Sequence, residues 1–201
     1  MHISEGVLSG PVLISGIVLA AAGTAIGLKK MDYDRIPRAG ILSASFFVAS
    51  LVHVPIGPSS VHLILNGIVG LLLGWGAFPA ILVALSLQAL FFQFGGITTL
   101  GVNTLIMALP ALLCYFIFNP LIRKRSSIAL PAAFACGCFS VFLGAVMVGL
   151  ALVFTEKDFL KVSGMVVFAH LPIMVIEGII TGFCVAFLRK VDPAMLPGFP
   201  E

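Results

Sequence analysis

Long apolar runs with very few charged residues dominate this sequence, and they restrict the folds that the chain can adopt. Hydrophobic residues make up 60% of the 201 positions and charged residues 9%, whereas about 25% of a soluble domain is charged. A membrane-spanning helix needs about 20 apolar residues in succession, and several runs here reach that length. Transmembrane β-barrels show short alternating segments instead. The sequence therefore predicts an all-α integral membrane protein.

Glycine, proline and basic residues divide the apolar sequence into about seven expected transmembrane helices. The expected spans are residues 10–28, 39–51, 62–76, 78–93, 102–122, 130–154 and 162–188. Prolines and glycines predict an irregular segment at 53–62, and a glycine-rich turn is expected at 94–101. No soluble linker or low-complexity tract interrupts the sequence, so residues 1–201 are expected to form a single transmembrane domain.

The basic residues predict how the bundle lies in the membrane. Segments 29–38, 123–125 and 189–190 hold nine of the eleven Lys and Arg, and seven spans place all three on one side. Lys and Arg are enriched in cytoplasmic loops, so we expect a multi-pass protein of the cytoplasmic membrane with its N-terminus outside and its C-terminus cytoplasmic. The net charge of +3 therefore reflects orientation and does not indicate a nucleic-acid partner. The histidines then gather at or near the outer face: His2, His53, His62 and His170.

The sequence opens with a possible metal chelate, Met1-His2. No positively charged n-region or signal-peptide cleavage site is evident, so we expect translation to begin at Met1 with nothing removed. The α-amine, the His2 amide nitrogen and the His2 imidazole can then close a five- and a six-membered ring around one ion. A further imidazole would complete a square of nitrogens, which suits Ni(II), Cu(II) or low-spin Co(II) better than tetrahedral Zn(II). The alternative is a frayed terminal histidine.

His62 is the candidate for the further imidazole, because it is expected to open the third helix on the face where Met1 emerges. Irregular backbone at membrane depth is tolerated where it is buried in protein or lines a polar cavity, which favours a site there. Alternatively, His62 only bonds to the backbone at a helix start. His53 is a possible additional ligand, or a polar tip at the membrane interface.

Other polar residues in the apolar runs are candidates for supporting roles. Asn66, Gln93 and Asn103 are possible partners for the second nitrogen of a metal-bound imidazole, or ordinary helix caps and interhelical bonds. Ionisable residues inside a membrane are functional by default. His170 and Glu177 lie seven residues apart on one helix face, and we assign them structural or coupling roles rather than ligand roles.

No motif in the sequence indicates catalysis or ATP hydrolysis: Gly-x-Ser-x-Gly, His-Glu-x-x-His and Walker motifs are all missing. A membrane-embedded metal enzyme would need an open metal position beside a general base, and no suitable carboxylate accompanies His62. A scaffold or vitamin-type capture protein with incidental histidines is a third possibility. We therefore expect a transport subunit and not an enzyme.

Five short motifs resemble the CbiM/NikM family, the substrate-capture components of energy-coupling-factor transporters for cobalt and nickel. They are Met1-His2-Ile3 with Glu5-Gly6, Val54-Pro55-Ile56, His62-Leu63, Gly95-Gly96-Ile97-Thr98-Thr99-Leu100-Gly101-x-Asn103, and Ala169-His170-Leu171-Pro172-Ile173 followed by Val175-Ile176-Glu177-Gly178. The resemblance thus extends over nearly the whole chain.

This resemblance implies that the Met1 amine, the His2 amide and imidazole, and the His62 imidazole bind the ion. The substrate would be Co(II), with Ni(II) as the alternative, and no organic cofactor is implied. Implied partners are a transmembrane T-component, cytoplasmic ATPase subunits and a small auxiliary membrane protein, within membrane lipid. Imported cobalt would feed cobalamin synthesis. The chain departs from the family at 57–61, at Phe94 and at His53, which leaves the choice of ion open.

Overall fold

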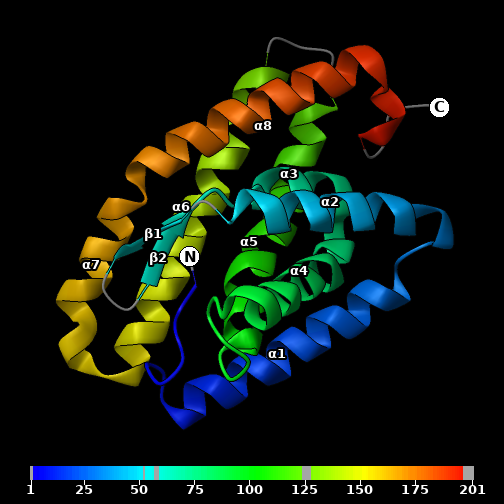
Figure 1. Cartoon of the computed structure of the whole chain (residues 1–201). Helices are drawn as coiled ribbons and strands as arrows, with labels where there is room; N and C mark the ends of the chain where they lie inside the picture. The colour runs from blue at the N-terminus through cyan, green and yellow to red at the C-terminus, as the bar shows by residue number, and fades with distance from the viewer. Residues whose placement is uncertain (1, 52, 57–58, 124–127, 197–201) are drawn as a thin grey trace.

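Helices form almost all of the structure, a computed structural model that describes residues 2–51, 53–56, 59–123 and 128–196 (Figure 1). The helices in this part of the chain are α1 (Gly10–Lys29), α2 (Ile36–Ala49), α3 (Asn66–Leu73), α4 (Ala77–Phe92), α5 (Leu100–Ile122), α6 (Ala129–Thr155), α7 (Leu160–Ala169) and α8 (Leu171–Val191). The strands β1 (His53–Ile56) and β2 (Ser59–His62) pair antiparallel. Short 3-10 turns occur at η1 (Tyr33–Arg35), η2 (Gly74–Gly76), η3 (Lys157–Phe159) and η4 (Pro193–Met195).

Five helical segments in the described residues are long and apolar enough to cross a membrane. They are α1, Asn66–Phe92, α5, α6 and Lys157–Val191. The prediction of a helical, multi-pass membrane protein is confirmed. Helices α1, α5 and α6 begin and end within two residues of the predicted spans.

The prediction that His62 opens a helix is wrong, because His62 is the last residue of β2. The segment expected to be irregular is a hairpin in which His53 pairs with His62 and Val54 with Val61. Helix α3 begins only at Asn66, since Leu65 has left-handed backbone (φ 59°) that an α-helix does not accommodate. The β-branched residues of the hairpin favour the extended backbone.

The last predicted span is also interrupted, because α7 ends at Ala169 and α8 begins at Leu171. Pro172 lies in the first turn of α8, where its ring would clash with the carbonyl four residues earlier in a continuous helix. The predicted span 39–51 corresponds to α2, which has 14 residues. At about 1.5 Å per residue it covers roughly 21 Å, which is less than the ~30 Å hydrocarbon core.

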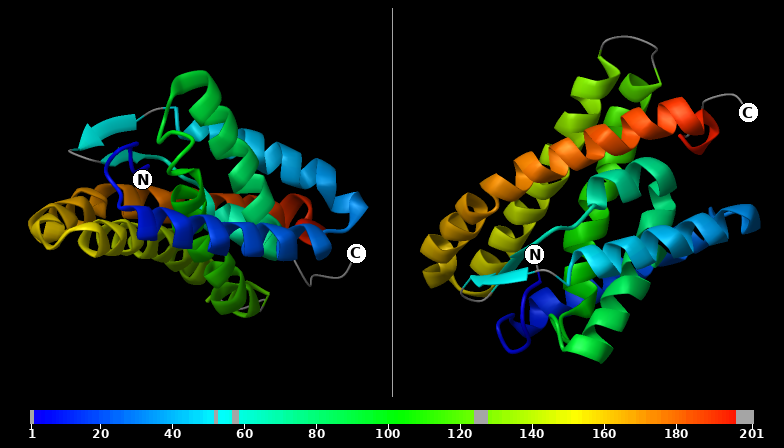
Figure 2. Two further views of the ribbon diagram at one scale, coloured as in Figure 1. Left: turned by 90° about the horizontal axis from the view of Figure 1, so that it is seen from below. Right: turned by 45° about the horizontal axis from the view of Figure 1, so that its top comes forward.

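The segment 66–92 is interrupted at η2, where Gly74 has a φ of 54°. Trp75 in η2 lies beside the C-terminal end of α1, where Lys30 Nζ is 5.1 Å from the indole centroid. At the opposite end of α4, Gln88 donates a hydrogen bond to Ser50, directly after α2. Helices α3 and α4 therefore run in opposite directions, and the hairpin, the N-terminal segment and the end of α4 lie at one end of the bundle (Figures 1 and 2).

Close packing around α5 and α6 holds the bundle together. A Cβ on Gly70 of α3 would lie 2.0 Å from the Ala111 carbonyl oxygen of α5, and one on Gly137 of α6 would lie 2.4 Å from that of Glu177. Small residues allow helices to approach this closely in membranes. Ile3 and Ile64 are fully buried in the same core. Because they flank His2 and His62, this core packing holds both histidine-bearing segments in place.

Candidate metal centre

Asn103 of α5 holds the N-terminal segment beside the start of that helix. Its side-chain oxygen accepts a hydrogen bond from Ile3 N–H (2.9 Å), and its amide nitrogen donates to the Ile3 carbonyl (3.1 Å). The same amide nitrogen also donates to Thr99 Oγ1 (3.1 Å). Two bonds from one buried side chain thus satisfy both backbone groups of the residue after His2, and they fix the direction of the chain there.

The loop before α5 receives Glu5 through a turn that only glycine accommodates. Gly95 and Gly96 have positive φ (75° and 106°), and a Cβ on Gly96 would lie 2.0 Å from Glu5 Cγ. The Glu5 carboxylate accepts hydrogen bonds from the Thr98 N–H (3.0 Å) and hydroxyl (3.2 Å). These bonds, chiefly the one from the backbone N–H, hold the pKa of Glu5 below its ordinary value. The N-terminal segment is therefore held at two residues, at Ile3 by Asn103 and at Glu5 by Thr98.

A chain of hydrogen bonds fixes the tautomer of His2, whose side chain is buried. The Ser50 hydroxyl donates to the Phe47 carbonyl, so its oxygen accepts from Gln88 Nε2. This orientation turns Gln88 Oε1 toward His2 Nε2, at 2.8 Å. Since an amide oxygen only accepts, His2 must carry its proton on Nε2. The lone pair is then on Nδ1, the nitrogen that can close a six-membered chelate ring with the His2 amide.

His62 presents the complementary nitrogen. Its ring centroid lies 4.7 Å from that of His2, with the two rings inclined by 30°, and its side chain is 2% exposed. His62 Nδ1 donates to the Leu63 carbonyl (2.9 Å), which places the lone pair on Nε2. That nitrogen is buried and has no hydrogen-bond partner in the described part of the chain. In this tautomer Nε2 is the nitrogen that can donate to a metal ion.

Glu177 of α8 anchors the segment that follows His62. Its Oε1 accepts hydrogen bonds from the backbone N–H groups of Ile64 and of Leu65, the latter at 2.8 Å. The carboxylate is fully buried, and the two donors lie at the left-handed turn where β2 leads into α3. Glu177 thus sets the position of His62 through the backbone, as a positioning residue that does not touch the imidazole pair.

The other predicted site residues lie in varied places. Asn66 is buried and donates to the Met107 carbonyl (3.4 Å), while Gln93 lies at the exposed end of α4. His170 is buried at the α7–α8 junction, where Nδ1 bonds to the Val166 carbonyl (2.7 Å). Met1 and the side chain of His53 lie outside the described residues.

Sequence reasoning missed Gln88, the residue that bonds to His2. It lies inside α4, whose other residues are apolar except for Ser86, and a polar residue inside a membrane-spanning helix is a signal of function. Among the described residues, no group of three or more His, Cys, Asp and Glu side chains is arranged to hold a metal. An ion between His2 and His62 would therefore need further donors of another kind, such as backbone nitrogens.

Comparison with known families identifies the chain. Residues 2–195 match the family model of CbiM, described as the cobalt uptake substrate-specific transmembrane region. The chain belongs to the CbiM family. CbiM proteins are metal transport proteins and not enzymes. The family description names a transmembrane region, which agrees with a multi-pass membrane protein.

Individual relatives are also named as metal transport proteins. The chain is 40% identical to a Haemophilus influenzae protein named as a metal transport protein, over 98% of this chain and 97% of the relative. It is 30% identical to the fused nickel transport protein NikMN of Rhodobacter capsulatus, over 100% of this chain and 67% of that protein. A crystal structure of a transition metal transporter superposes with a TM-score of 0.75 at 27% identity, covering 96% of this chain and 94% of that one.

Proposed function

We propose that this CbiM protein captures Co(II), with Ni(II) as the alternative, as the substrate-binding component of an energy-coupling-factor transporter. The observation that carries the proposal is the buried pair of imidazoles, His2 and His62, whose ring centroids are 4.7 Å apart. Their hydrogen bonds leave a lone pair on one nitrogen of each ring. The family description, cobalt uptake, supports the choice of ion.

In the proposed site, four nitrogens surround the ion: the Met1 amine, the His2 amide, His2 Nδ1 and His62 Nε2. The first three come from one chelating segment, and the fourth comes from the hairpin. Loss of the amide proton on binding makes the donor set anionic, which offsets part of the charge of a divalent ion. A planar set of nitrogens disfavours Zn(II), which prefers tetrahedral geometry.

We further propose that the single domain crosses the membrane seven times, with the N-terminus outside and the C-terminus cytoplasmic. The reversal at η2 supports separate crossings by the α3 and α4 segments. Helices α2 and α3 have 14 and eight residues, so the adjoining hairpin and turns would complete their passage. Three basic segments then share the cytoplasmic side, and the imidazole pair faces the outside, where the ion is captured.

Partners would complete the transporter. We propose a transmembrane T-component and cytoplasmic ATPase subunits, because the chain carries no nucleotide-binding motif. A small auxiliary membrane protein would join them, and the fused nickel transport protein NikMN, of which this chain covers 67%, supports an added component. The delivered cobalt would serve cobalamin synthesis.

Equilibrium dialysis of the purified protein with labelled cobalt tests the site. His62→Ala and His2→Ala are each expected to lower the affinity by more than ~100-fold, since loss of an outer partner alone costs about 10–100-fold. Two residues added before Met1 convert its amine to an amide and are expected to cause the same loss. Retention of full affinity by His62→Ala would refute the site. A protein without cobalt or nickel by elemental analysis, and with unchanged dialysis after the extension, would indicate a scaffold instead.

A further inference from the structure

A pocket lies at the opposite end of the bundle from the imidazole pair. Its volume is about 280 Å³, close to the low end of the ~300–1,000 Å³ that small-molecule sites usually have. It lies between the end of α1, the turn η1, the turn η2 and the C-terminal half of α5. Lys30, Arg35, Gly74, Trp75, Tyr115 and Phe116 are among the residues that line it.

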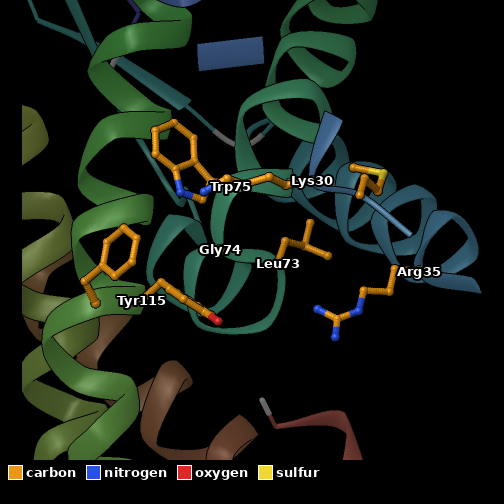
Figure 3. Close-up of a pocket in the computed structure, with 9 residues that line it drawn as sticks. Lys30, Arg35, Leu73, Gly74, Trp75 and Tyr115 are labelled. Atoms are coloured by element: carbon orange, nitrogen blue, oxygen red, sulfur yellow. The ribbon is translucent and has the colours of Figure 1, made fainter. Parts of the chain in front are cut away.

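Two cationic side chains border this pocket. Lys30 extends along the Trp75 ring, with Nζ 5.1 Å from its centroid, and it makes no ion pair with a carboxylate within the described ranges. Arg35 Nε lies 3.6 Å from the Asp32 carboxylate, and both side chains are more than half exposed. Such an exposed pair contributes little. Figure 3 shows Lys30 alongside Trp75, and Tyr115 and Arg35 approaching from opposite sides. The pocket is therefore suited to an anion.

Two glycines, Gly74 and Gly76, line the pocket. Gly74 has φ of 54°, and a Cβ there would lie 3.2 Å from the Tyr115 ring. A Cβ on Gly76 would lie 3.2 Å from the terminal methyl of Met31. Side chains at either position would press on the pocket walls. Gly74 is the stricter of the two positions, because its positive φ disfavours any side chain.

The surroundings indicate that the anion belongs to a lipid. Phe116, at the rim, is 53% exposed, and the next residue of α5, Ile117, is 47% exposed. On a membrane-spanning helix such residues face acyl chains. Tryptophan and tyrosine are enriched where membrane meets water, and basic pockets between transmembrane helices on the cytoplasmic side bind anionic headgroups. Apolar surface for a chain and positive charge for a phosphate therefore adjoin at one place.

We infer that this pocket binds the phosphate of an anionic phospholipid headgroup, with Lys30 and Arg35 as its cationic contacts. Neither the metal ligands nor the choice of ion enters this inference. It rests on the proposed orientation, which puts this end of the bundle at the cytoplasmic side, but not on the proposed metal capture, because the two sites share no residue.

The single tryptophan of the chain is Trp75, so intrinsic fluorescence reports on this pocket directly. The full-length protein is placed in bilayers of unlabelled phosphatidylcholine to which brominated phosphatidylglycerol or brominated phosphatidylcholine is added. Quenching is normalised to the emission of each variant without bromine. We expect brominated phosphatidylglycerol to quench at a lower mole fraction than brominated phosphatidylcholine. Lys30→Gln and Arg35→Gln should each lower that preference about tenfold, because each removes a charge-assisted hydrogen bond to the phosphate.

Matched controls separate the pocket from general surface charge. Lys29→Gln and Arg38→Gln remove the same charges from neighbouring positions that do not line the pocket, and they should change the preference less than twofold. Equal effects of Lys29→Gln and Lys30→Gln would overturn the inference, as would equal quenching by the two brominated lipids. Inorganic phosphate tests the other source of the same anion: if millimolar phosphate abolishes the lipid preference, the site binds free phosphate and the lipid assignment is wrong.

Discussion

His62 and His170 have similar surroundings, yet only His62 belongs to the proposed metal site. Both are buried, both have Nδ1 bonded to a backbone carbonyl, and both keep Nε2 without a hydrogen-bond partner in the described residues. His62 faces the ring of His2. No ring contact to His170 occurs in that same part of the chain. A buried, unpartnered imidazole nitrogen is therefore insufficient to identify a ligand, and the second imidazole makes the difference.

The anchor of His62 should show the largest effect on this comparison. Glu177→Ala leaves the N–H groups of Ile64 and Leu65 without their acceptor, at about 1–3 kcal/mol for each buried donor. We expect cobalt affinity to fall by about 100-fold, measured by equilibrium dialysis. Glu177→Gln keeps an acceptor oxygen and should recover most of that affinity. If Gln and Ala lower affinity equally while both proteins remain folded, the negative charge matters more than the position of His62.

The partner of His2 should show an intermediate effect. Gln88→Leu removes the acceptor that fixes the His2 tautomer, and we expect cobalt affinity to fall by about 10-fold, the lower end of the range for such partners, because the chelate itself remains. Dialysis of Gln93→Leu, a change at the exposed end of the same helix, provides the control and should match the unmodified protein. Equal affinities for the Gln88 and Gln93 variants would show that the tautomer is set in another way.

The smallest effect on cobalt binding is expected at His170. His170→Ala should change the affinity less than about threefold, because no ligand is lost. Thermal unfolding should instead show a loss of roughly 1–3 kcal/mol, since a buried side chain and its bond to Val166 disappear. A loss of cobalt binding as large as that of His62→Ala would remove the distinction between the two histidines.

The helical membrane fold was predictable because long apolar runs leave a chain few alternatives. Helices α1, α5 and α6 follow directly from such runs and their basic ends. The break at His170 was missed even though Pro172 marks it, because the apolar run continues across the proline. The hairpin was missed because four-residue strands carry little periodic signal, and prolines and glycines predict only a break.

The candidate site was predictable at its histidines and less so at their partners. His2, His62 and Asn103 stand in sequence contexts that indicate polar roles. Gln88 was not predicted at all. It lies five residues before Gln93 and so on a different face of the helix, and only its packing against Ser50 shows that its face is inward. Glu177 was recognisable as an intramembrane carboxylate, but its contact with residues 64 and 65 joins segments more than 110 positions apart.

The fastening of the N-terminal segment has a kinetic consequence. One donor segment is part of the chain's own end, clamped by Asn103 at Ile3 and by Thr98 at Glu5, so an ion held behind it leaves only after those clamps open. The residence time of the ion would then depend on how long four hydrogen bonds persist and how long Ile3 stays buried. Equilibrium selectivity would remain a property of the nitrogens. The protein would separate the choice of metal from the speed of its release.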